Sequence, residues 1–357
     1  MSARAGLGRA AGARTAAGAR TIGPALAVAL AFVVPGCQWG DASFMNPGGP
    51  VAEAQRTHFL RVIAITSIAI VPVLVGVPLL LWRYSIRDAK ADYTPDWEFS
   101  WPLEAAIWGI PLAVIVTLGV LLFHSTHRLD PYKPISGGST LDVQVIGLDW
   151  KWLFIYPDQN IATVGYMAVP TGRDIAFEIT SDTVMQSFAI RALAGQIYAM
   201  PGMTTRQHVM ADAPRRLQGE NMQFNGTQFS TQRFEAAALS PDDFEAWVGR
   251  VRQSAVSLDR NAYTRLAARS TKAEAVRRFP PTGAPERSLY FSDVADGLFA
   301  ERLRAYHTGR AVPPARQPGS PDFQPEAPLV VSGSSAHADP HAARHGQSRQ
   351  DGTHHGR

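Results

Sequence analysis

The single cysteine of this 357-residue chain, Cys37, limits the chemistry that the chain can do. One thiol cannot form a disulfide within the chain, and it cannot supply a cluster of thiolates for a metal ion. Glu104 is a second candidate, because it lies at the start of a long apolar stretch, where an ionisable group suggests a function. Histidines near the C-terminus could bind metal loosely, although a solvated tail is the favoured interpretation; they are His337, His341, His345, His354 and His355.

The surroundings of Cys37 suggest a different use for its thiol. Residues 1–20 contain arginines and no acid, residues 22–34 are apolar, and Gly36 precedes the cysteine. A basic region, a short apolar region and a small residue together are typical of a secretory signal. The cysteine at its end resembles the lipobox of bacterial lipoproteins, which implies a signal peptide over residues 1–36 and acylation of Cys37. The alternative is an uncleaved first membrane helix, for which the apolar run is short.

Two longer apolar stretches predict membrane-spanning helices. The sequence favours one helix over residues 58–83 and a second over residues 103–124, each long enough to cross about 30 Å of hydrocarbon. Prolines within the first stretch are compatible with a membrane helix. The composition gives no sign of a nucleic-acid surface, because the formal net charge is only +4 and no binding motif carries the basic residues.

The charges beside these stretches predict the topology. Arg83, Arg87 and Lys90 follow the first apolar stretch, and basic residues beside a span favour the cytoplasmic side. The loop of residues 84–102 is therefore expected in the cytoplasm. Residues 37–57 and everything after the second helix are then expected in the periplasm of a bacterial inner-membrane protein.

The rest of the chain changes from a strand pattern to a helix pattern. Residues 141–148 alternate between apolar and polar, and similar short runs follow, which predicts an all-β sandwich or barrel within residues 125–239. Ser240 and Pro241 then have the features of a helix N-terminus, with Ser240 as the cap, and predict a helical extension over residues 240–308. Residues 309–357 are rich in Pro, Ser, Gly and His and are expected to be a disordered tail.

Two spans followed by a β domain resemble subunit II of the haem-copper respiratory oxidases. The resemblance implies a cupredoxin-like fold for residues 125–239, and an aromatic-rich helical extension like that of the quinol-oxidase members. Four stretches carry it in the family's order: Glu104 to Pro111, Asp149 to Pro157, Ser181 to Phe188, and Leu217 to Gln232.

The resemblance also shows what the last two of these stretches lack. In the copper-bearing branch, two Cys, two His, one Met and a Glu carbonyl hold a dinuclear copper centre, in which soft sulfur ligands suit copper. The matching positions here carry none of those side chains; the first His falls on Gln186, the two Cys on Asn221 and Asn225, the Glu on Gln223, the second His on Phe229 and the Met on Gln232. This pattern implies no metal in this chain and places it beside subunit II of the cytochrome bo-type ubiquinol oxidases.

Membership of that branch would imply the rest of the assembly. Haems and one copper would lie in a partner subunit I, which would oxidise ubiquinol, and subunits III and IV would complete the complex without cytochrome c as donor. Glu104 would lie at the entrance of a proton pathway; alternatively it would stabilise a helix N-terminus. Trp150 and Trp152, which match electron-entry aromatics of the copper-bearing branch, would pack against subunit I.

Two other functions compete with this interpretation. The chain could be an independent membrane-anchored lipoprotein of cupredoxin-like fold that acts in binding or oxidase assembly. It could also be a copper electron carrier, which the missing ligands largely exclude.

Overall fold

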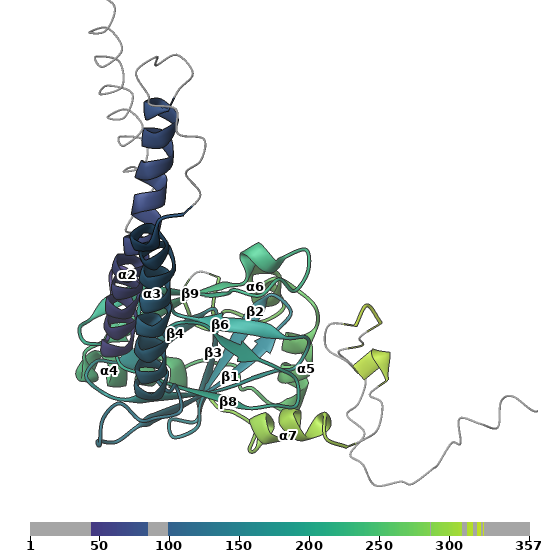
Figure 1. Cartoon of the computed structure of the whole chain (residues 1–357). Helices are drawn as coiled ribbons and strands as arrows, with labels where there is room; N and C mark the ends of the chain where they lie inside the picture. Colours follow the sequence, from purple (N-terminus) through teal and green to yellow (C-terminus); the bar gives the residue numbers. More distant parts are fainter. Residues whose placement is uncertain are drawn as a thin grey trace, which may run out of the picture.

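The computed structural model describes residues 44–84, 99–285, 287–308, 313–316, 320–322 and 324 (Figure 1). The expected signal peptide, the lipidation site Cys37, most of the loop 84–102 and nearly all of the tail 309–357 lie outside the described residues. Within them, a hairpin of two long helices precedes an all-β domain with a helical extension. The fold class predicted from the sequence, with its cupredoxin-like β domain, is therefore confirmed.

The two long helices expose their apolar side chains, as membrane-spanning helices do. Helix α2 covers Pro50–Arg83 and helix α3 covers Trp101–Arg128, so both are long enough to cross a bilayer. The Ser125 hydroxyl and the His58 ring nitrogen Nδ1, 2.8 Å apart, share a hydrogen bond between the helices. Helix α2 begins eight residues before the predicted residue 58, because its first turns pack on the β domain rather than in an apolar environment.

A short segment before helix α2 joins that helix to the β domain through backbone hydrogen bonds. The Gly48 amide donates to the Ala192 carbonyl at 2.7 Å, and the Asp212 amide donates to the Gly48 carbonyl at 2.9 Å. The Ala52 amide donates to the Leu193 carbonyl at 3.1 Å. Helix α2 therefore starts from a fixed point on the domain rather than from a free linker.

The β domain is a sandwich of two sheets. One has the strand order β11-β3-β2-β1-β5-β8 and the other the order β4-β10-β9-β6-β7. Aromatic rings fill the space between them, with Phe188 and Phe234 stacked at 5.5 Å between centroids. The strands are β1 Leu141–Leu148, β2 Lys151–Tyr156, β3 Ile161–Val164, β4 Tyr166–Pro170, β5 Ile175–Ser181, β6 Gln186–Ala189, β7 Ile197–Ala199, β8 Thr205–Val209, β9 Arg215–Asn221, β10 Arg233–Leu239 and β11 Leu289–Phe291.

The extension builds a second core on the outer face of the first sheet. Its helices are α4 Pro241–Arg252, α5 Arg260–Ala267, α6 Lys272–Arg277 and α7 Leu298–Ala305. Residues of α5, α6 and α7 pack against the outward side chains of β1, β2 and β3, whereas α4 closes the core between the sheets (Figure 1). Strand β2 is consequently buried on both faces.

Two details of the extension differ from the sequence-based expectation. It is not purely helical, because β11 pairs with β3 as an edge strand. Its last helix, α7, begins only at Leu298, because the residues before it form other bonds. The Asp293 carbonyl accepts from the Leu258 amide, and the Val294 amide donates to the Asn160 side chain. The Ser240 cap of α4 is as predicted, since its hydroxyl accepts from the Asp243 amide at 3.2 Å.

Gly49 is expected to be indispensable to the junction between helix α2 and the β domain. A Cβ at this position would lie 1.9 Å from the Met210 carbonyl oxygen, which is backbone and cannot rotate away. Gly49→Ala should therefore destabilise the detergent-solubilised chain by about 1–3 kcal/mol, measured as a lower midpoint of thermal unfolding. Gly76→Ala is the matched control, because a Cβ there meets nothing within 4 Å. Equal midpoints for the two variants would contradict the prediction.

Candidate functional site

Four of the six residues expected at copper-ligand positions come together in one hydrogen-bonded group, called here the amide cluster. It consists of Gln186, Asn221, Asn225 and Gln232, with Gln232 at its centre. The Gln232 amide nitrogen donates to Gln186 Oε1 at 2.5 Å. The Gln232 oxygen Oε1 accepts from the Asn221 nitrogen at 3.1 Å and from the Asn225 nitrogen at 2.7 Å.

The pairing of strands explains why these side chains meet. Gln186 begins β6, which pairs antiparallel with the end of β9, where Asn221 lies. Strands β9 and β10 are antiparallel neighbours, so the loop between them returns Gln232 to the start of β10, opposite Asn221. The Asn221 amide donates to the Gln232 carbonyl at 3.1 Å. The positions expected from the sequence are therefore adjacent because the sheet register makes them so.

Backbone groups of neighbouring segments fix the cluster from outside. The Leu148 carbonyl, at the end of β1, accepts from both Gln186 and Gln232 at 3.3 Å. Asn221 Oδ1 accepts from the backbone amides of Ser187, at 2.9 Å, and Gln223, at 3.0 Å. Burial of amide groups is costly unless they are paired, and these contacts supply most of the pairing.

The donor set of the cluster does not fit copper. Carboxamide side chains are poor ligands for copper compared with thiolate, imidazole or thioether groups. The cluster's NH2 groups face its oxygens, so the polar atoms satisfy one another rather than converging on a cation. Among the described residues, no three His, Cys, Asp or Glu side chains are placed to hold a metal ion. The arrangement is therefore a polar cross-link between loops, from which we derive no electron-transfer step.

The two remaining positions lie beside the cluster rather than within it. The Phe229 ring, in the short 3-10 helix η2 (Phe229–Thr231), packs against Phe224 with 5.8 Å between the centroids. Gln223 contributes its backbone amide to Asn221, while its side chain is half-buried at the surface. Matching of the sequence to the family's loop did not distinguish these two roles from those of the four clustered amides.

The structure corrects the expected role of the two tryptophans. Trp152 is 1% exposed and packs edge-on against Phe188 in the core between the sheets, so the prediction that it packs against another subunit is wrong. Trp150 is 6% exposed and lies beneath the Arg269 guanidinium, 4.8 Å from its ring centroid. Trp150 therefore offers almost no surface to a partner either, because the extension covers it.

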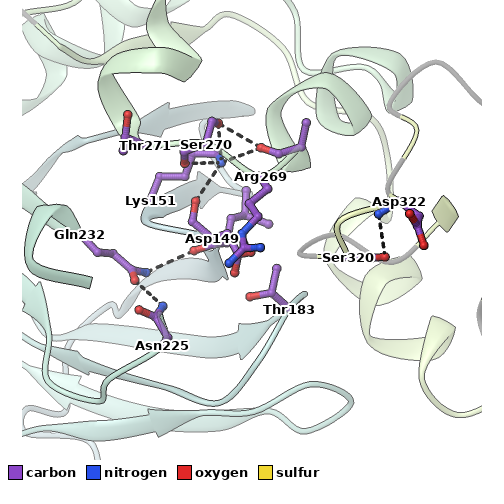
Figure 2. Close-up of polar contacts among 12 residues, drawn as sticks. Asp149, Lys151, Thr183, Asn225, Gln232, Arg269, Ser270, Thr271, Ser320 and Asp322 are labelled. Atoms are coloured by element: carbon purple, nitrogen blue, oxygen red, sulfur yellow. Dashed lines mark hydrogen bonds and ion pairs between the residues drawn. The ribbon is translucent and has the colours of Figure 1, made fainter. Parts of the chain in front are cut away.

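A buried lysine next to the cluster was not anticipated from the sequence. Lys151, between the two tryptophans, is 1% exposed, and its amine donates to oxygens of Asp149, Ala268 and Ser270 at 3.0–3.1 Å. Figure 2 shows this amine bonded to Asp149 and Ser270. Burial lowers the pKa of Lys151 to about 7, because it disfavours the charged form.

Glu104 lies apart from the cluster, in the first turn of helix α3. Its carboxylate oxygen Oε2 accepts from the indole nitrogen of Trp108, one turn along the helix, at 3.1 Å. A carboxylate in the first turn also interacts favourably with the helix dipole. The indole therefore fixes the carboxylate at the end of the apolar helix where the sequence placed it.

Gln232 should be the most sensitive member of the amide cluster. Gln232→Leu keeps a similar volume but leaves the polar groups of Gln186, Asn221 and Asn225 without their partner. We expect a loss of about 2–4 kcal/mol in the free energy of unfolding, measured by urea unfolding of the detergent-solubilised chain. The matched control, Gln223→Leu, should change it by less than about 0.5 kcal/mol. Similar losses in both variants would show that the cluster adds no stability.

Lys151 should make the stability depend on pH. In the unfolded chain its amine has a pKa near 10.4, and in the folded chain about 7. Between these values the unfolded chain binds the extra proton, so the free energy of unfolding should rise as the pH rises from about 7 to about 10. Lys151→Met should lack this rise, and groups shared by both proteins cancel in the comparison. Parallel stability curves for the two proteins would refute the assignment.

Comparison with known proteins agrees with these features. No family model matches the chain. The cytochrome bo(3) ubiquinol oxidase subunit 2 of Pseudomonas putida is 41% identical over 233 residues, which cover 65% of this chain and 73% of the relative. The ubiquinol oxidase subunit 2 of Acetobacter aceti is 38% identical over 282 residues, covering 78% and 86%.

Solved structures give a weaker likeness, restricted to part of the chain. The periplasmic domain of subunit II of cytochrome oxidase of Bradyrhizobium japonicum is 21% identical, with a TM-score of 0.30, and covers 30% of this chain and 91% of that one. The curated relatives, by contrast, combine high identity with coverage of most of their own length. The chain belongs to the family of quinol oxidase subunit 2 proteins.

Proposed function

We propose that the chain is a non-catalytic but required subunit of a proton-pumping quinol oxidase in the bacterial inner membrane. The observation that carries this proposal is the amide cluster, which occupies the copper-ligand positions on a chain of the quinol oxidase family. Without ligands suited to copper, the β domain has no means of accepting electrons from a soluble donor such as cytochrome c. Ubiquinol would be oxidised, and oxygen reduced to water, in subunit I, which would hold the haems and the remaining copper.

The two long helices would bind the chain to the membrane and to its partners. Helices α2 and α3 expose apolar side chains along their length, which lipid and the helices of subunit I would cover. Subunits III and IV would complete the assembly. The basic residues near the end of α2 favour a cytoplasmic loop, so the β domain and its extension would lie in the periplasm. Acylation of Cys37 would add an anchor on that same side.

Glu104 would serve the assembly at the opposite membrane face. Its carboxylate lies at the start of an apolar helix and is held by the Trp108 indole. A carboxylate so placed can take up protons from the cytoplasm and deliver them to an adjacent subunit. The indole hydrogen bond would keep it pointing in a constant direction while it does so.

Assembly with a haem protein is the first expected result. The detergent-solubilised chain, purified from its own membrane, should carry a large haem-containing subunit, detected by its absorption spectrum. The complex should reduce oxygen with ubiquinol as donor and not with cytochrome c. A folded chain that purifies alone would instead support an independent membrane-anchored lipoprotein that acts in binding or oxidase assembly.

The role of Glu104 is testable in the same complex. Glu104→Gln keeps the size and the hydrogen-bond acceptor but removes the proton-accepting group. Turnover with ubiquinol should fall about tenfold, the effect of a barrier about 1.4 kcal/mol higher, while the haem content stays the same. Glu245→Gln is the control, because Glu245 is an exposed acid on helix α4. Unchanged turnover in Glu104→Gln would exclude the proton role and leave a structural one.

A further inference from the structure

We infer that the C-terminal extension acts as a strap that holds the three loops of the amide cluster together. The three loops are the β1–β2 turn (residues 148–151), the β5–β6 loop (182–185) and the β9–β10 loop (222–232). The extension contacts each loop in a different way. Two of the contacts are buried and are called here the anchors: Lys151 in the β1–β2 turn and Asp182 in the β5–β6 loop.

The first anchor joins the extension to the β1–β2 turn. The Lys151 amine has four acceptors within 3.0–3.1 Å, of which three belong to the extension: the carbonyls of Ala268 and Ser270 and the Ser270 hydroxyl. The fourth is the Asp149 carbonyl of the turn itself. A buried amine of this kind is favourable only while its acceptors are in place, so Lys151 ties residues 268–270 to the turn.

The second anchor joins the extension to the β5–β6 loop. Asp182 is 2% exposed, and its two carboxylate oxygens accept from different parts of the extension. The Tyr263 hydroxyl of α5 donates at 2.6 Å, and the Tyr306 hydroxyl, just after α7, donates at 2.9 Å. One carboxylate therefore holds two helices of the extension at the same loop.

A third contact reaches the β9–β10 loop through Trp150. The Arg269 guanidinium covers the Trp150 ring and pairs with the Asp149 carboxylate at 3.5 Å. On the β9–β10 loop, Gly226 lies beside the same indole, since an added Cβ there would be 3.4 Å from a Trp150 ring carbon. The indole therefore has Arg269 of the extension on its face and Gly226 of the loop beside it.

Each anchor lies close in sequence to an acceptor on which the amide cluster depends. Lys151 is three residues from Leu148, whose carbonyl accepts from Gln186 and Gln232. Asp182 precedes Thr183, whose hydroxyl accepts from the Gln186 amide at 3.0 Å. The Asp182 amide also donates to the Gly147 carbonyl at 3.0 Å, which joins the first two loops. A movement of the extension would therefore displace the acceptors of the cluster.

Hydrogen exchange of the full-length, detergent-solubilised chain tests this inference. The variants are Lys151→Met and the pair Tyr263→Phe with Tyr306→Phe, which removes both hydroxyls at little change in volume. The amides to follow are Ser187 and Gln223, which bond to Asn221 on the far side of the cluster. Their exchange should become at least about tenfold faster in either variant, as expected for loss of about 1.4 kcal/mol of local protection. Arg260→Met is the control, because its half-exposed guanidinium pairs with Glu301 inside the extension and away from the three loops.

If exchange rises in residues 260–271 and 300–306 but stays at the wild-type rate in residues 186–189 and 221–232, the extension does not hold the cluster and the inference is wrong.

A third variant keeps the test valid should the buried anchors prove necessary for folding. Arg269 is partly exposed, so Arg269→Ala should fold. It should speed exchange by severalfold around Gly226, which lies beside the Trp150 indole. Unchanged exchange there would show that Arg269 does not stabilise the β9–β10 loop, and the inference would be wrong.

Discussion

The buried polar groups of the amide cluster must form hydrogen bonds with one another or with the backbone. This requirement determines the conformation of the three loops around the cluster. Gln232 meets it by bonding to three other amides and to the Leu148 carbonyl. A buried amide without a partner would cost a few kcal/mol, a large part of the stability of an ordinary domain. Each loop that supplies a partner is consequently fixed, and the geometry that a metal centre would need is replaced by a neutral network.

The extension belongs to the same unit as the sandwich, because β2 is buried on both faces. Its inward residues Trp152, Phe154 and Tyr156 face the other sheet, and Leu153 and Ile155 face the helices of the extension. A sheet with one face in water would alternate with polar residues, as the start of β1 does. Apolar contacts in the second core provide most of the binding between the extension and the sheet. The buried polar anchors determine where the extension lies on the loops.

The sequence predicted those features that depend on neighbouring residues. The alternation in residues 141–148 and the Ser240 cap were enough to locate β1 and α4. The burial of Lys151 was not predictable, because its acceptors in the extension lie 117 and 119 residues away. Strand β11 has three residues, too few for a periodic pattern. Trp152 was predicted at a subunit contact rather than in the core, because an aromatic run does not reveal which part of the chain covers it.

The attachment of helix α2 to the β domain has a consequence for how the chain is made. Arg215 donates to the Pro47 carbonyl across 168 residues, and Gly48 bonds to Ala192 and Asp212. During translation, residues 47 and 48 are synthesised long before their partners at residues 192, 212 and 215. Both membrane helices must therefore leave the ribosome with this end of α2 still unpaired, and its docking is a late event of biogenesis. A chain that stalls before residue 192 would leave the backbone groups of Pro47 and Gly48 without their partners and open to the cell's quality-control proteases.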